Sequence, residues 1–227
     1  MKKIPFYFVM LPAIFMITSC LKQDGQNFQT FVIEPVVVVE ESPLPIVSSL
    51  YPGLERFLVP DLTGRVERED CLLLSFKIDF EAQPDSRYYT ATETFRVALP
   101  ASLPAVSADT FVVEGFDTPI IEAAVHRSNS GNKALIDDKL FLILVQEKNK
   151  NYEYTMVYQP FPQDLPSSYA TPPNLYVSAK YINDTPSNTI DDDTYLRVFD
   201  LSDFKKYLSD DLDWTGTKTV KILCRGE

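Results

Sequence analysis

Apolar and polar residues alternate with a period of two along much of this 227-residue chain. Between Leu74 and Phe80 (LSFKIDF) every second residue is apolar, and residues 95–99 and 175–181 repeat this alternation. Such alternation predicts β-strands with one buried face. Residues 140–145 (LFLILV) are continuously apolar, which is typical of a strand buried on both faces. The pattern predicts an all-β protein.

One segment, Ser202 to Leu212, has helical spacing, because Phe204, Tyr207 and Leu208 fall on one helix face. We expect a helix of two or three turns there. Proline-rich stretches separate the strands, and a boundary near 114–119 (EGFDTP) divides them into two groups. The lengths of the two groups are typical of a small barrel, at residues 31–115, and of a β-sandwich, at residues 116–227.

The N-terminus has the pattern of a secretion signal, with Lys2 and Lys3 followed by a short apolar run up to Met16. Ile17, Thr18, Ser19 and Cys20 then resemble the lipobox of bacterial lipoproteins. The resemblance implies a signal peptide at 1–19 and lipidation of Cys20, which would hold the protein on a membrane. The alternatives are an uncleaved anchor, for which the run is short, and simple secretion. Residues 20–30 are expected to form a flexible tether.

The formal net charge is −11 and becomes −13 once Lys2 and Lys3 leave with the signal. An acidic surface repels phosphate backbones, so nucleic acid is not an expected partner. Beside Cys20 the chain has two cysteines, Cys71 and Cys224, which are either buried free thiols or a disulfide. No C-x-x-C pair occurs, and the cysteines therefore give no indication of zinc or redox chemistry.

Several segments after the lipobox occur in an order that resembles the NigD-like lipoproteins of Bacteroidota. They are DCLLLSFKIDFEAQ (70–83), DTPI (117–120), LFLILV (140–145), YEYTMVY (152–158), LYVSAK (175–180) and VFDLSDF (198–204). The resemblance implies an OB-like N-terminal barrel followed by a C-terminal β-sandwich, in a lipid-anchored protein of the cell envelope, with the outer membrane as the expected membrane. It implies no catalytic residue.

Motifs for catalysis and cofactors are absent from the sequence. His126 is the only histidine, and neither a G-x-S-x-G elbow nor a glycine-rich phosphate loop is present. His126 is interpreted as a loop or strand-end residue, with a catalytic role as the alternative. Asp191, Asp192 and Asp193 are interpreted as a solvated loop, with an irregular calcium site as the alternative. We expect no cofactor, no metal and no catalytic residue.

Aromatic residues next to predicted turns are the candidates for ligand binding. Tyr88 and Tyr89 follow the turn at 83–87, and Trp214 follows the predicted helix. Exposed rings stack on sugars or pack against protein partners. Trp214 is interpreted as packing in the core or as a lid, with a platform for a ligand as the alternative. Three hypotheses follow: a non-enzymatic envelope lipoprotein that binds a glycan or an envelope protein, a glycosidase-like hydrolase with two converging carboxylates, and a structural subunit with an exposed edge strand.

Overall fold

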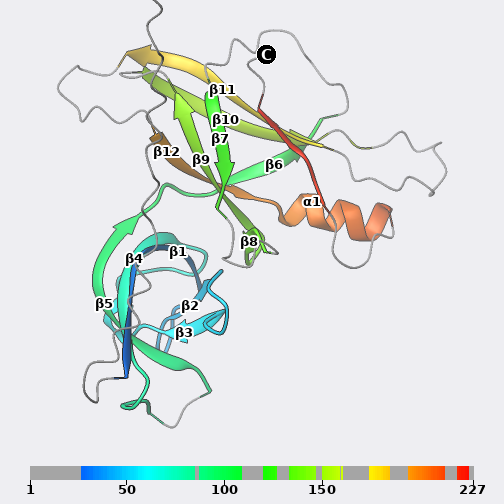
Figure 1. Ribbon diagram of the computed structural model, residues 1–227. Helices are drawn as coiled ribbons and strands as arrows, with labels where there is room; N and C mark the ends of the chain where they lie inside the picture. Colours follow the sequence, from blue (N-terminus) through cyan, green and yellow to red (C-terminus); the bar gives the residue numbers. More distant parts are fainter. Residues whose placement is uncertain are drawn as a thin grey trace, which may run out of the picture.

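The computed structural model describes residues 27–84, 87–108, 120–126, 133–146, 150–158, 160, 174–184, 194–212 and 219–224. These residues form a closed barrel and an eight-stranded curled sheet, which lies above the barrel in Figure 1. The predicted signal peptide 1–19, Cys20, the aspartates 191–193 and Trp214 lie outside the described residues. Within the described part of the chain, no helix has the length and apolar character needed to cross a membrane.

Five strands close the barrel in the order β1-β2-β3-β5-β4, with β1 also paired to β4. All pairs are antiparallel except β3 with β5. This is the strand order of an OB fold, as the sequence resemblance implied. The barrel elements are β1 (Phe28–Glu40), β2 (Ile46–Ser49), β3 (Arg56–Leu58), the short helix η1 (Pro60–Leu62), β4 (Cys71–Asp79) and β5 (Tyr89–Ala98).

The barrel interior is filled by aromatic and branched side chains. Phe76 lies at its centre, fully buried, with its ring centroid 4.5 Å from those of both Phe31 and Phe57. Leu74 and Ile78 point inward beside it, which confirms the predicted buried face of β4. Aromatic pairs at this distance stabilise a core beyond the area that they bury.

On β5 the predicted strand is confirmed but its predicted buried face is wrong. Phe95 and Val97 are 52% and 41% exposed, whereas Glu93 and Arg96 are less exposed and form an ion pair at 3.9 Å. The pairing with β4 shifts register between Ser75 and Phe76. A one-residue shift reverses the side of the sheet on which every later residue points.

The second module consists of β6 to β13, and its strand order is β13-β11-β10-β6-β12-β9-β7, with β8 paired to β9. Figure 1 shows the sheet curling over α1. Its elements are β6 (Leu103–Ser107), β7 (Ile120–Val125), β8 (Leu135–Ile136), β9 (Lys139–Gln146), β10 (Lys150–Tyr158), β11 (Leu175–Asp184), β12 (Thr194–Asp200), α1 (Ser202–Lys206), the π-type turn η2 (Tyr207–Asp211) and β13 (Ile222–Cys224).

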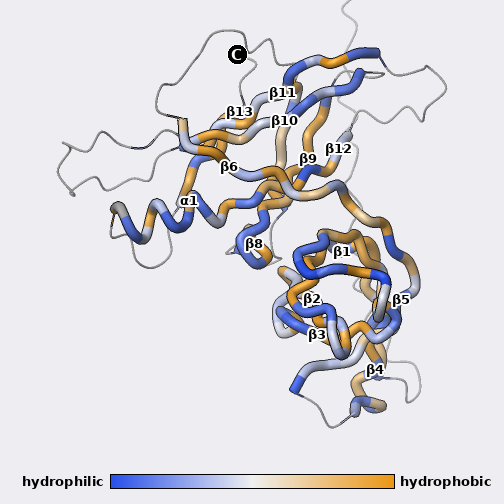
Figure 2. Tube along the Cα trace, turned by 180° about the vertical axis from the view of Figure 1, so that it is seen from behind, coloured by the Kyte–Doolittle hydropathy of each residue, from blue (hydrophilic) through white to orange (hydrophobic). Residues whose placement is uncertain are grey.

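Strand β6 joins the two halves of this curled sheet, because its start pairs with β12 and its end with β10. One core contains Leu142 from β9, Met156 from β10 and Val177 from β11, so the halves pack face to face as the layers of a sandwich do. Hydrophobic positions gather along the strands of both modules in Figure 2, whereas the turn after β8 is hydrophilic.

The predicted C-terminal helix is present and buries Phe204 and Leu208 against the curled sheet. Its first turn is capped by a neighbour, since the Ser202 N–H donates to Asp200 Oδ1 at 2.9 Å.

The all-β class with an OB-like barrel, a sandwich-like module and one short helix is confirmed. The chain leaves the barrel at Ala98, and β6 already belongs to the sheet, ahead of the predicted division at residue 115. Residues 28–30, which we expected in the tether, begin β1.

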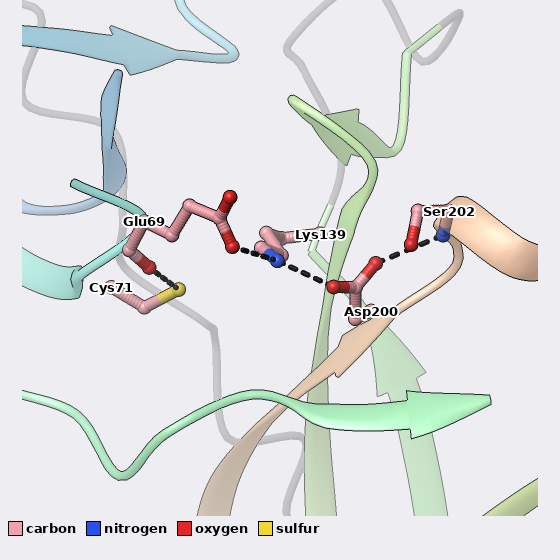
Figure 3. A network of polar contacts seen from close by, with 5 residues as sticks. All are labelled: Glu69, Cys71, Lys139, Asp200 and Ser202. Atoms are coloured by element: carbon pink, nitrogen blue, oxygen red, sulfur yellow. Dashed lines mark hydrogen bonds and ion pairs between the residues drawn. The ribbon is translucent and has the colours of Figure 1, made fainter. Parts of the chain in front are cut away.

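A small apolar cluster joins the two modules. Val37 and Cys71 from the barrel pack with Phe141 and Val198 from the sheet. Beside the cluster, Lys139 Nζ binds Glu69 Oε2 of the barrel at 3.3 Å and Asp200 Oδ2 of the sheet at 2.6 Å (Figure 3). The Lys139 side chain is only 5% exposed, so its charge depends on these two carboxylates.

Candidate binding site

The curled sheet splits open between β10 and β12, where β6 begins. Strand β6 starts at Leu103, which pairs with Phe199 of β12, and it reaches β10 only at Ala105, opposite Met156. Upstream of Leu103, no strand of the described residues lies between β10 and β12. The chain that arrives from the barrel therefore borders a gap in the sheet.

A cavity of about 720 Å³ occupies this split. Cavities of this size are typical of small-molecule sites, which are mostly apolar with a few polar groups. Its wall comes from β10, β11, β12 and the chain between β5 and β6, and the lining residues are Pro100, Ala101, Leu103, Tyr152, Glu153, Tyr154, Lys180, Tyr181, Ile182, Arg197 and Val198.

Tyrosines form the aromatic side of the cavity. Tyr152 and Tyr154 are almost buried, whereas Tyr181, opposite Tyr152 on the neighbouring strand, is 47% exposed. The Tyr152 and Tyr181 rings meet edge to face with their centroids 6.1 Å apart. The sequence pattern predicted Tyr181 on the buried face of β11. It is instead exposed at the cavity mouth, near a register shift between Asn151 and Tyr152.

Arg197 is one of two cations in the cavity wall, the other being Lys180. Its guanidinium carbon lies 4.8 Å from the Tyr154 ring centroid and 5.4 Å from that of Tyr195. Both distances fall within the range of cation–π contacts, and Arg197 Nη1 also donates to the Leu196 carbonyl oxygen at 3.1 Å. These contacts restrict the position of the guanidinium, whose remaining N–H groups can bind an acceptor. Behind it, buried Gln146 donates a hydrogen bond to the Tyr154 hydroxyl. Burial raises the pKa of Tyr154, although Arg197 opposes this effect, so the hydroxyl stays protonated at neutral pH.

The lining of the cavity does not contain the pair of acids that the hydrolase hypothesis requires. Glu153 is the one carboxylate among the lining residues, whereas the carboxylate mechanism that we considered requires two acids facing one another. No group of three or more histidine, cysteine or acidic residues that could hold a metal ion occurs in the described ranges. Arginine and tyrosine are the residues that most often dominate binding energy at interfaces.

The structure places the sequence-predicted candidates away from this cavity. Tyr89 begins β5 at the barrel end, Tyr88 directly precedes it, and neither is among the lining residues. His126 directly follows β7, as a strand-end residue, and burial lowers its pKa. We did not predict Tyr154 or Arg197. The only sequence signal for Arg197 is a lone cation in the apolar strand segment YLRVF.

Cys71 is a free, buried thiol at the junction of the modules. Its Sγ lies 3.5 Å from the Glu69 carbonyl oxygen (Figure 3), and burial raises its pKa to about 11. Cys224 pairs with Val177 at the outer edge of the sheet. The free-thiol alternative for Cys71 is confirmed.

Neither a known protein family nor a curated protein matches the sequence. The fold does match solved structures. An uncharacterised protein from Parabacteroides merdae has 15% identity and a TM-score of 0.55, with 86% of this chain and 87% of that chain covered. A candidate lipoprotein from Bacteroides fragilis has 11% identity and a TM-score of 0.53 over 86% and 87%. A NigD-like immunity protein from Bacteroides caccae has 12% identity and a TM-score of 0.45 over 86% and 84%.

The two matches with TM-scores of 0.55 and 0.53 show that the fold of this chain, an OB-like barrel followed by a curled β-sheet, occurs in other proteins. This chain shares that architecture with the Parabacteroides and Bacteroides proteins over most of its length. At such low identity the likeness concerns the fold alone.

Proposed function

We propose that this protein is a non-enzymatic, NigD-like lipoprotein of the bacterial envelope, anchored through Cys20, which binds a ligand at the cavity between β10 and β12. The cavity carries the proposal, because it combines three tyrosines and an oriented arginine with a single carboxylate. A glycan or an extended segment of an envelope protein presents the rings and hydrogen-bond acceptors that such a lining recognises.

The sequence and the comparison with Bacteroides fragilis support the envelope location. Ile17 to Cys20 resembles a lipobox, and the protein with a TM-score of 0.53 is itself a candidate lipoprotein. Lipid anchoring would place the protein on the outer membrane, with either its periplasmic or its outer leaflet as the attachment side. Mass spectrometry of the purified chain tests this part: the proposal expects acylation at Cys20, and an unmodified Cys20 in the native host contradicts it.

The binding role is tested by titrating the purified protein with soluble glycan fragments and with extended peptides, using calorimetry. Tyr181→Ala removes an exposed ring from the cavity mouth, while Tyr89→Ala removes a ring of nearly equal exposure, 43% against 47%, from the barrel. We expect Tyr181→Ala to weaken binding by about tenfold or more, because truncating a tyrosine that dominates an interface costs about 2 kcal/mol or more, and Tyr89→Ala to leave it unchanged.

Two results would contradict the binding proposal. Ligands that bind equally well to the wild type and to Tyr181→Ala would place the site elsewhere, and no binding across both panels would leave the cavity without a role. New reducing ends released from the glycan panel would favour the hydrolase alternative. Arg197→Gln provides a second cavity variant, which keeps a polar, hydrogen-bonding side chain, although a shorter one, and removes its charge.

A further inference from the structure

Aromatic side chains gather at the end of the barrel where β1 begins and where β4 turns towards β5. The Phe80 and Tyr89 rings meet edge to face at 5.3 Å, and Lys77 Nζ lies 3.7 Å above the Phe28 ring. Phe28 and Tyr89 are 41% and 43% exposed. We call Phe28, Phe80, Tyr88 and Tyr89 the aromatic end of the barrel.

The aromatic end and the curled sheet lie at opposite ends of the same barrel strands. Along β4, Cys71 packs against the sheet, while Asp79 pairs with Phe28 at the other end. Figure 1 shows β1 beginning at the barrel end remote from the sheet. The nine residues of β4 span roughly 30 Å along the strand at 3.3 Å per residue, and the aromatic end and the junction lie at the two ends of this strand.

The proposed lipid anchor is attached close to the aromatic end. Phe28 is the first residue of β1, and only seven residues (21–27) lie between it and Cys20 along the chain. The eight steps from Cys20 to Phe28 reach at most about 29 Å when fully extended. The anchor therefore keeps this end of the barrel within one tether length of the bilayer, while the curled sheet starts at the far end of the strands.

The local charges allow this end to approach a lipid surface. Lys77 and Arg87 each lie over a ring, of Phe28 and Tyr88 respectively, with their cationic groups next to the aromatic end. The Asp79 carboxylate accepts hydrogen bonds from the Glu81 and Ala82 N–H groups, and Glu81 is an exposed acid on the same turn. The two cations offset two of the three acids between residues 77 and 89, the third being Asp85, which lies outside the described residues.

We propose that the aromatic end of the barrel rests against the headgroup region of a phospholipid bilayer, so that the barrel is a pedestal which holds the cavity of the curled sheet away from the membrane. This inference rests on the lipid anchor of the proposed function. Tyrosine rings favour the membrane–water interface, because one edge is apolar and the other forms hydrogen bonds. Lysine and arginine reach past such rings to headgroup phosphates. The rings thus add orientation to the attachment that the lipid provides.

The test places a single fluorescent tryptophan at either end of the protein. In a Trp214→Phe background, which removes the only native tryptophan, Tyr89→Trp labels the aromatic end and Tyr181→Trp labels the cavity mouth. The full-length acylated proteins are reconstituted into phosphatidylcholine vesicles that contain a headgroup-attached nitroxide lipid as quencher. Phe28→Trp serves as a second probe of the aromatic end, and circular dichroism verifies that each variant is folded.

We expect quenching at residues 89 and 28 to be several-fold stronger than at residue 181, with a blue-shifted emission only at the first two. Equal quenching at both ends of a protein with a verified acyl group would overturn the pedestal orientation and leave the proposed function intact. Stronger quenching at residue 181 would overturn it as well, since the cavity would then face the membrane. A protein without the acyl mass would instead refute the anchor, and the inference would fall with it.

Discussion

The closed barrel and the curled sheet differ in what fills their interiors. The barrel core surrounds Phe76 with apolar side chains and buries three stacked or tilted phenylalanine rings. The buried residues of the sheet include three tyrosines of β10 (Tyr152, Tyr154 and Tyr158) and Gln146 of β9. The sheet also opens into a cavity of about 720 Å³. A strand order that closes on itself leaves no edge, whereas a sheet that curls about one short strand leaves a split. In the proposed function, the closed barrel is the rigid module and the open sheet is the module that binds the ligand.

Phe76→Ala is expected to have the largest effect on stability, because it removes the central ring of the barrel. A loss of about 3–5 kcal/mol in the free energy of unfolding is typical when a buried phenylalanine becomes alanine. Urea denaturation followed by circular dichroism measures the change. The matched control is Phe95→Ala on the neighbouring strand, whose ring is 52% exposed and whose loss should be several times smaller. Similar losses for both variants would mean that the aromatic core does not determine barrel stability.

Asp200→Ala is expected to destabilise the junction of the two modules by about 2 kcal/mol, because Lys139 would stay buried with only the exposed Glu69 as its partner. Lys139→Met should cost less, since both carboxylates can then be hydrated. Burial alone would raise the pKa of Asp200, but Lys139 and Ser202 outweigh it and lower this pKa from its ordinary 3.8. Stability from the pair is therefore present above that value and is lost as the pH falls through the lower folded pKa.

The pH dependence gives the junction a second readout. Burial would lower the pKa of Lys139, but Asp200 and Glu69 outweigh it and raise the pKa above 10.5. The contribution of the Lys139–Asp200 pair to the free energy of unfolding is thus complete at neutral pH. It disappears as the pH rises through the raised pKa of Lys139 in the folded protein. Unfolding free energies measured from acid to neutral pH should converge for the wild type and Asp200→Ala at the acid end. A constant difference across that range would exclude the ion pair as the cause.

Tyr154→Phe should cost about 1–2 kcal/mol in the sheet, because Gln146 would lose the hydroxyl to which it donates while staying buried. The other polar atom of Gln146, Oε1, has no hydrogen-bond partner among the described residues. Adding Gln146→Met to Tyr154→Phe should therefore restore part of the lost stability. Thermal unfolding of both single variants and the double variant measures the coupling, and strictly additive losses would show that the two side chains act independently.

The burial of Cys71 is expected to have the smallest effect on the free energy of unfolding. Its effect on the reactivity of the Cys71 thiol should be large. A pKa of about 11, against an ordinary 9.0, leaves about a hundredfold less thiolate at neutral pH. In a Cys224→Ser background, iodoacetamide should label Cys71 very slowly in the folded protein and rapidly in urea. Equal rates under both conditions would show that the junction opens freely, and would remove the contrast between a sealed junction and an open cavity.

Sequence periodicity was sufficient to predict the class of fold and the elements with a clear pattern of buried positions. The strand at 74–80, the apolar strand at 140–145 and the helix at 202–212 all follow from local patterns, since side-chain period and secondary structure are directly coupled. The OB-like order came from the resemblance to a known family and is confirmed by the pairing of β1 with β4 and β3 with β5. The binding roles of Tyr88 and Tyr89 stay predictions. Their position at the aromatic end of the barrel now makes a bilayer the proposed partner in place of a glycan or a protein.

Only the tertiary structure decided what lies next to each strand. Alternation shows that one face of a strand is buried, but it carries no information about which strand pairs with it or where the register shifts. The shift between β4 and β5 exposed Phe95, and the late start of β6 created the cavity that Tyr154 and Arg197 line. Lys139 is an ordinary polar residue in the sequence, and it becomes a buried bridge only because barrel and sheet meet around it.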